Sequence, residues 1–137
     1  MQSRRLFLIG GLLALGLSSC GDGRKPTFPV SGKVVLGDKP VANATVVFHP
    51  AGGDANELRP RATTQADGTF RLTTYDGNDG APAGEYRVTV ELWLSSGRGD
   101  EGPTSRLPAK FARPETSGLA ATVAAGPNEL KPFGIKR

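Results

Sequence analysis

The chain has 137 residues, which is enough for one domain of ordinary size and too few for two. Its net charge of +4 is spread along the chain with no block of five like charges, so we expect no nucleic-acid partner. The single cysteine excludes an internal disulfide and a cysteine pair on a metal ion.

The N-terminal segment has the features of an export signal. Arg4 and Arg5 form a positive end, and the apolar stretch over residues 6–17 is shorter than the ~20 residues that a membrane-spanning helix needs. The stretch ends in Leu17-Ser18-Ser19-Cys20, which resembles the bacterial lipobox, an aliphatic residue and two small residues before a lipid-modified cysteine. An ordinary signal peptide with a chance cysteine and a short anchor helix are the alternatives.

The lipobox resemblance implies that residues 1–19 are a lipoprotein signal peptide and that Leu17, Ser18 and Ser19 are read by the signal peptidase. Cys20 then carries diacylglycerol and fatty acid such as palmitate. Two buried acyl chains suffice for durable anchoring, because each methylene contributes roughly 0.8 kcal/mol. We therefore expect a cell-envelope protein that is anchored in a membrane by lipid and faces away from the cytoplasm.

The route of export is left open by the positive end. Arg4 and Arg5 also resemble a twin-arginine signal, which is a receptor-read address rather than an anchor. The basic residue that often follows in that pattern is replaced by Ile9, and two arginines can equally serve a general export signal. After the lipidated cysteine, residues 20–28 are polar and contain Gly21 and Gly23, so we expect a flexible tether.

The remaining chain, residues 29–137, is predicted to be all-β. Glycine and proline make up 30 of the 137 residues and fall between short apolar runs, as turns do in such proteins. Period-two alternation or turn spacing predicts seven strands, at 30–36, 41–50, 61–66, 69–74, 85–94, 117–124 and 128–135. We expect them to form two antiparallel layers that enclose a core.

Two of the predicted strands are especially well marked. The 85–94 strand alternates without a break, with Tyr86, Val88, Val90, Leu92 and Leu94 on the inner face. The strands at 61–66 and 69–74 flank Asp67-Gly68, a strong hairpin signal, which predicts a positive φ angle at Gly68.

Three motifs, taken together, resemble a known family. They are Gly32-x-Val34 followed by Gly37-x-x-Pro40-x-x-x-Ala44-x-Val46-x-Phe48; Thr64-x-x-Asp67-Gly68-x-Phe70-x-Leu72; and Pro82-x-Gly84-x-Tyr86-x-Val88-x-Val90. In this order they are similar to the carboxypeptidase regulatory-like domain of bacterial envelope lipoproteins. The resemblance implies a transthyretin-like (prealbumin-like) fold, here a seven-stranded antiparallel Greek-key sandwich. It implies no peptidase activity, because in carboxypeptidases this module is an accessory to a separate catalytic domain.

Catalysis and a metal cofactor are not expected. His49 is the only histidine, so neither a histidine cluster nor a conventional facial metal triad can form. It is predicted to lie exposed at a strand end. Asp76, Asn78 and Asp79 are weak candidates for calcium, but the position where an EF-hand loop needs glutamate is Arg87, and a polar turn is the alternative.

Trp93 is a candidate ligand platform, because an exposed indole on a sheet can stack on a sugar ring; packing beneath a loop is the alternative. The expected function is therefore a non-enzymatic structural or interaction module of the envelope, whose partner is an envelope protein or a polysaccharide. A carbohydrate- or small-ligand-binding module is the second interpretation, and a hydrolase is the third.

Overall fold

The computed structural model describes residues 23–53, 57–94 and 104–137. These form eleven strands and one short 3-10 helix: β1 (Val30–Leu36), β2 (Lys39–Pro40), β3 (Thr45–Pro50), β4 (Arg61–Thr63), β5 (Thr69–Arg71), β6 (Gly84–Glu91), β7 (Trp93–Leu94), β8 (Thr104–Ser105), η1 (Ala109–Ala112), β9 (Leu119–Val123), β10 (Asn128–Glu129) and β11 (Phe133–Ile135). Each of the seven predicted ranges contains at least one strand. Over this part of the chain, no helix is long and apolar enough to cross a membrane.

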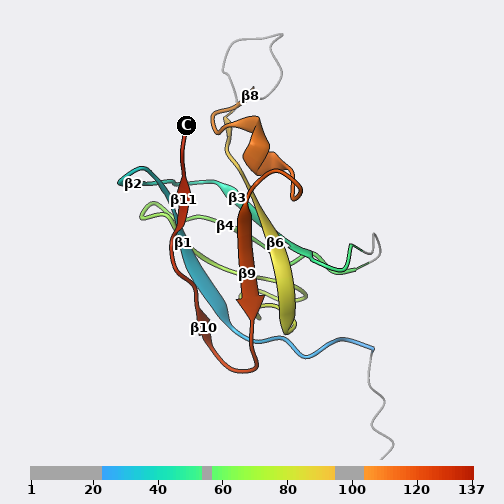
Figure 1. The fold of residues 1–137 in the computed structure, drawn as a ribbon. Helices are drawn as coiled ribbons and strands as arrows, with labels where there is room; N and C mark the ends of the chain where they lie inside the picture. Colours follow the sequence, from blue (N-terminus) through green and yellow to red (C-terminus); the bar gives the residue numbers. More distant parts are fainter. Residues whose placement is uncertain (1–22, 54–56, 95–103) are drawn as a thin grey trace, which may run out of the picture.

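Two sheets form a β-sandwich (Figure 1), which confirms the all-β prediction. The first sheet is built around β1, which pairs with β2, β5, β10 and β11. The second has the order β4-β3-β6-β9 and is antiparallel throughout. A separate pair joins β7 to β8.

The prediction of an entirely antiparallel sandwich is wrong in the first sheet. Both C-terminal strands run parallel to β1, with Ser31 opposite Glu129 and Val35 opposite Gly134. Alternation of apolar residues determines which side chains point inward, but it carries no information about strand direction. The chain crosses from β9 in one sheet to β10 in the other, and this crossing sets the parallel direction.

The Asp67-Gly68 turn is present, but its two strands separate. Gly68 has a φ angle of +79°, as predicted. A single bridge links the strands, at Arg61 and Thr73, while β4 pairs with β3 and β5 pairs with β1. The Gly68 carbonyl accepts a hydrogen bond of 2.9 Å from the Val34 amide. The turn therefore joins the two sheets instead of closing a long hairpin.

The predicted inner faces meet in the core. Val34, Val46, Phe48, Val88 and Val90 are almost completely buried, and Phe70, Leu72, Val123 and Ile135 are buried with them. The Phe48 ring lies at the centre, with centroids 5.6 Å from Tyr86, 6.3 Å from Phe133 and 6.4 Å from Phe70. Burying each such side chain contributes roughly 1.5–3 kcal/mol.

The 85–94 strand is broken, and its outer face is partly covered. The strand β6 ends at Glu91, and β7 then pairs with β8 instead of continuing in the sheet. Thr89 alternates with the predicted inner-face residues Val88 and Val90, which predicts that it lies on the open face, yet only 4% of its surface is exposed. The helix η1 packs against β6, so the segment around it removes part of this face from solvent.

Candidate functional site

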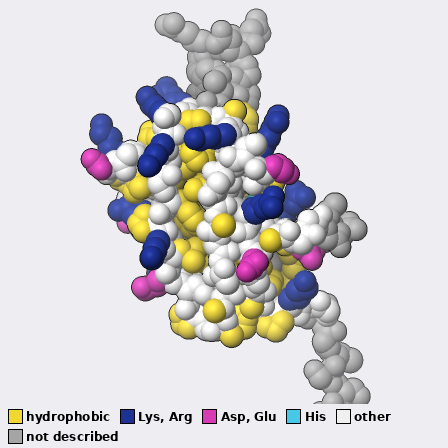
Figure 2. All heavy atoms as spheres, in the orientation of Figure 1, with side chains coloured by type: hydrophobic (Ala, Val, Ile, Leu, Met, Phe, Trp, Pro, Cys, Tyr) yellow, Lys and Arg dark blue, Asp and Glu magenta, His cyan; other side chains and the backbone are white. Residues whose placement is uncertain are grey.

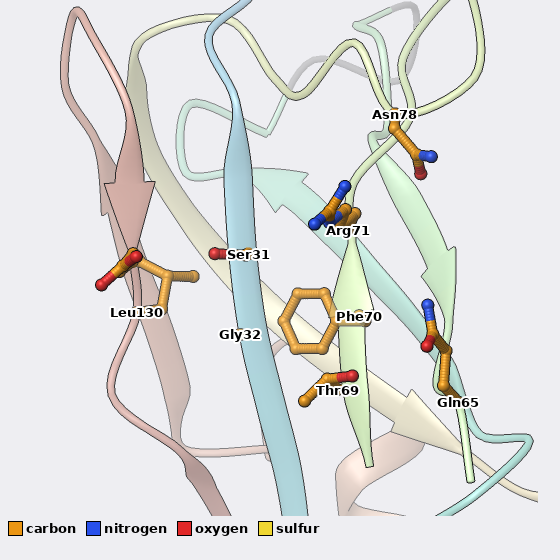
Figure 3. Close-up of a pocket in the computed structure, with 9 residues that line it drawn as sticks. Ser31, Gly32, Gln65, Thr69, Phe70, Arg71, Asn78 and Leu130 are labelled. Carbon is orange, nitrogen blue, oxygen red and sulfur yellow. The ribbon is translucent and has the colours of Figure 1, made fainter. Parts of the chain in front are cut away.

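A groove crosses the outer face of the first sheet (Figure 3). Its centre is Ser31 on β1, which lies opposite Arg71 of β5 and Glu129 of β10. The Ser31 side chain is short and those of Arg71 and Glu129 are long, so the sheet surface is hollowed at Ser31 between them. The resulting cavity has a volume of about 430 Å³ and is further lined by Gln65, Thr69, Asn78 and Leu130.

Gly32 and Phe70 form the support beneath this groove. The two residues lie opposite one another on β1 and β5, and the Phe70 ring lies over Gly32 on the inner side of the sheet. A Cβ atom on Gly32 would lie only 2.5 Å from the Phe70 ring. The ring also stacks on Phe133 at 6.2 Å. The groove therefore rests on packed core and not on a loop.

A second cavity, of about 360 Å³, continues the first. Both are lined by Ser31, Arg71, Asn78 and Glu129, and the second extends to the Asn128 turn. We call the two together the Ser31 groove. The Asn128 amide donates to the carbonyl oxygens of Gly126 and Ala124 at 2.8 and 3.0 Å, which fixes this end.

The groove offers mixed hydrogen-bonding chemistry. The Arg71 guanidinium is a fixed fork of donors, the Glu129 carboxylate only accepts, and amides and hydroxyls do both. Within the described residues, the Arg71 and Glu129 side chains form no ion pair and no side-chain hydrogen bond. Such a surface suits a ligand that carries several hydroxyl or amide groups.

The Asp76–Asp79 loop, named as a weak calcium candidate, is organised from within. Asp79 accepts hydrogen bonds from the backbone amides of Thr74, Tyr75 and Asp76 at 2.7, 2.9 and 3.1 Å. Burial raises the pKa of the Asp79 carboxyl, but these three amides outweigh it and lower the pKa overall. Asn78 has a φ angle of +59°. Both Asp79 oxygens are therefore occupied in shaping a turn that places Asn78 at the groove.

Among the described residues, no three histidine, cysteine, aspartate or glutamate side chains are grouped to hold a metal ion. Asp76 instead forms an ion pair with Arg24 at 3.3 Å. The neighbouring Lys25 amide donates to the Tyr75 hydroxyl at 3.0 Å. The segment that precedes β1 is thus held against this loop from Arg24 onward.

Trp93, the predicted ligand platform, is half exposed. Its indole nitrogen donates to the Glu91 carboxylate at 2.6 Å, which fixes the ring near the end of the second sheet. Trp93 and the Ser31 groove belong to different sheets, so the structure does not bring them together. The remaining predicted residues, Arg4, Arg5, Leu17, Ser18, Ser19 and Cys20, lie outside the described part of the chain.

Sequence reasoning missed the Ser31 groove, although it named Asn78 for another purpose. The outward parity of Ser31 and Arg71 within the predicted strands was the available signal. Glu129 joins them only through the parallel β1–β10 pairing, which the sequence pattern did not predict.

No protein-family model and no curated protein matches the chain. Solved structures with a similar arrangement include a 9R-lipoxygenase from Cyanothece PCC8801 (14% identity, TM-score 0.43, covering 80% of this chain and 16% of that one). Another is a DUF3823 family protein from Parabacteroides merdae ATCC 43184 (15% identity, TM-score 0.41, covering 82% of this chain and 46% of that one). A third is the dioxygenase domain of a dioxygenase carbohydrate-binding protein fusion from Streptomyces sp. SirexAA-E (23% identity, TM-score 0.37, covering 85% of this chain and 82% of that one). The chain spans less than half of the first two proteins. At these identities and TM-scores, the likenesses carry no inference about activity or ligand.

Proposed function

We propose that this chain is a lipid-anchored envelope protein whose β-sandwich serves as a non-enzymatic interaction module, and that the Ser31 groove is its binding surface. The observation that carries the proposal is the Arg71–Ser31–Glu129 row, in which opposite charges on two strands flank a hollow on a third. The fold of the module is proposed to be that of the carboxypeptidase regulatory-like domain.

The proposed partner is a polar envelope polymer or protein. A groove that spans three strands accommodates an extended segment better than a compact molecule. The donors of Arg71 and Asn78 and the acceptor of Glu129 match hydroxyl and amide groups along such a segment.

Lipid attachment at Cys20 fits the position of the tether. Gly23 is only three residues after Cys20, and three residues span at most about 11 Å. Since Arg24 and Lys25 contact Tyr75 and Asp76, that end of the domain would lie next to the membrane. The Ser31 groove, on the outer face of the first sheet, would then remain open to the surroundings.

A pull-down from solubilised envelope material, together with a glycan array, tests the proposal. Arg71→Ala and Glu129→Ala should each remove most of the captured partner, whereas Lys39→Ala on the same sheet should capture as the unmodified protein does. Equal capture by all four proteins would refute the Ser31 groove as the binding surface.

A second candidate function is carbohydrate binding at Trp93, which the half-exposed indole favours. Trp93 is the only tryptophan, so its fluorescence reports directly on a stacked sugar. A change in this fluorescence on addition of a sugar, unaffected by Arg71→Ala, would select this second surface. Binding that is lost with Arg71→Ala but kept with Trp93→Ala would select the groove.

A further inference from the structure

A separate cavity lies on the outer face of the β4-β3-β6-β9 sheet and is lined by several basic side chains. It has a volume of about 210 Å³ and is lined by His49, Arg59, Arg87 and Glu115, and the wall is completed by Pro50, Ala51, Gly53 and Pro114. His49 and Arg87 lie directly opposite one another on β3 and β6. The single histidine of the chain is therefore half-buried here, and not freely exposed as predicted.

This arrangement places like charges together. Within the described residues, neither the Arg59 nor the Arg87 guanidinium forms an ion pair or a hydrogen bond. Among the described residues, Glu115 is the only acidic side chain that lines the cavity. The guanidinium groups of Arg59 and Arg87 line the same cavity and their positive charges repel one another, so an anion between them would relieve a cost that the free protein bears.

His49 is held in place by a hydrogen bond, and its pKa depends on the neighbouring charges. Its Nε2 atom forms a hydrogen bond of 2.9 Å with the Thr89 hydroxyl, which is itself buried. Nδ1 is the ring nitrogen left for a ligand. Burial lowers the pKa of His49, and the positive charge of Arg59 lowers it further, while Glu115 and Glu91 act in the opposite direction. The neutral imidazole is thus favoured while the cavity holds no anion.

We propose that this cavity binds an oxyanion group, such as the phosphate, sulfate or carboxylate of an envelope ligand, between Arg59, Arg87 and His49. Guanidinium groups bind such planar or tetrahedral oxyanions through paired N–H donors. The volume admits one small anionic group. Glu115 at the rim would oppose highly charged anions.

The single histidine makes the test specific. The full chain, in neutral detergent micelles and with its histidine labelled with ¹³C, is titrated with sodium sulfate, which does not change its protonation near neutral pH. Sodium chloride at equal ionic strength controls for screening. We expect a saturable shift of the His49 ring signal with sulfate and a rise of the His49 pKa, because a bound anion favours the imidazolium. A parallel titration with acetate distinguishes carboxylates from tetrahedral anions, and saturation by either supports the proposal.

Variants assign the residues. Arg59→Gln and Arg87→Gln should each weaken sulfate binding about tenfold, the loss expected for one charge-assisted hydrogen bond. Glu115→Gln should strengthen it, and Lys39→Gln, which removes the same charge from the first sheet, should have no effect. The proposal is overturned if neither sulfate nor acetate shifts the His49 signal more than chloride does, or if Arg59→Gln and Arg87→Gln bind as the unmodified chain does.

Discussion

Replacing Gly68 by alanine tests how tightly the Asp67-Gly68 turn is packed on the first sheet. The φ angle of +79° already costs an alanine about 1–2 kcal/mol. In addition, its Cβ atom would lie 2.6 Å from the Val34 carbonyl oxygen and 3.0 Å from the Cβ atom of Pro40. That oxygen is fixed, because it accepts a hydrogen bond of 3.0 Å from the Val41 amide.

Relieving the clash would move the turn away from β1. The bond from the Val34 amide to the Gly68 carbonyl would then be lost or strained, and such a bond contributes about 1 kcal/mol. With the clash itself, the free energy of unfolding should fall by about 3 kcal/mol. That is a large part of a total that is typically ~5–15 kcal/mol.

Gly37 provides the matched control. Its φ angle is also positive, at +62°, but a Cβ atom there would meet nothing within 4 Å. Gly37→Ala should therefore cost only the conformational part, about 1–2 kcal/mol. Urea denaturation followed by circular dichroism measures both variants. Equal losses in the two would show that the contact between the turn and β1 is unimportant, and the packing argument would be wrong.

Three further predictions concern single side chains. The Thr64 hydroxyl is buried, donates a hydrogen bond to the Val41 carbonyl at 2.6 Å and accepts one from the Ala44 amide at 2.9 Å. In urea denaturation, Thr64→Val should therefore lower the free energy of unfolding by about 2 kcal/mol, and Thr64→Ser should lower it much less. Similar losses in the two variants would contradict this role of the hydroxyl. The pKa of the Asp79 carboxyl is lowered in the folded chain, so its contribution is complete above its usual value near 3.8 and is lost as the pH falls through the folded pKa. The stability difference between the unmodified protein and Asp79→Asn should thus shrink below about pH 4; a constant difference would count against the three amide hydrogen bonds. Cys20→Ala should abolish labelling by a radioactive fatty acid and release the protein from membranes, and a variant that still labels would refute lipidation at Cys20.

Side-chain parity made most of the core predictable. Val88 and Val90 alternate with polar residues, and Val46 and Phe48 lie two positions apart on one face of their strand; all four are buried where their strands face the other sheet. This works because a sheet with one apolar face must cover it. The same reasoning misplaced Thr89, which is buried on the outer face of β6; η1, a short helix twenty residues further along the chain, packs against this strand.

The Ser31 groove and the cavity lined by His49, Arg59 and Arg87 could not be predicted in the same way. Each depends on strands that are distant in sequence and on which strands are neighbours. Ser31 and Glu129 are brought together by a parallel pairing, and His49 and Arg87 by the register of β3 and β6. The sequence of the polar residues on an outer face shows no regular pattern, because almost any polar side chain is tolerated in solvent.

The central position of β1 explains how the Ser31 groove can stay intact beside the proposed membrane tether. A first strand at the edge of a sheet would fray as the tether moves. Here, Ser31 is paired on both sides, with Arg71 and Glu129, and Val35 is paired on both sides, with Pro40 and Gly134. Motion that starts at Cys20 must first release the contacts of Arg24 and Lys25 and then break two ladders of backbone hydrogen bonds. The groove is built on the strand nearest the proposed anchor, yet that strand is among the most firmly held in the sheet.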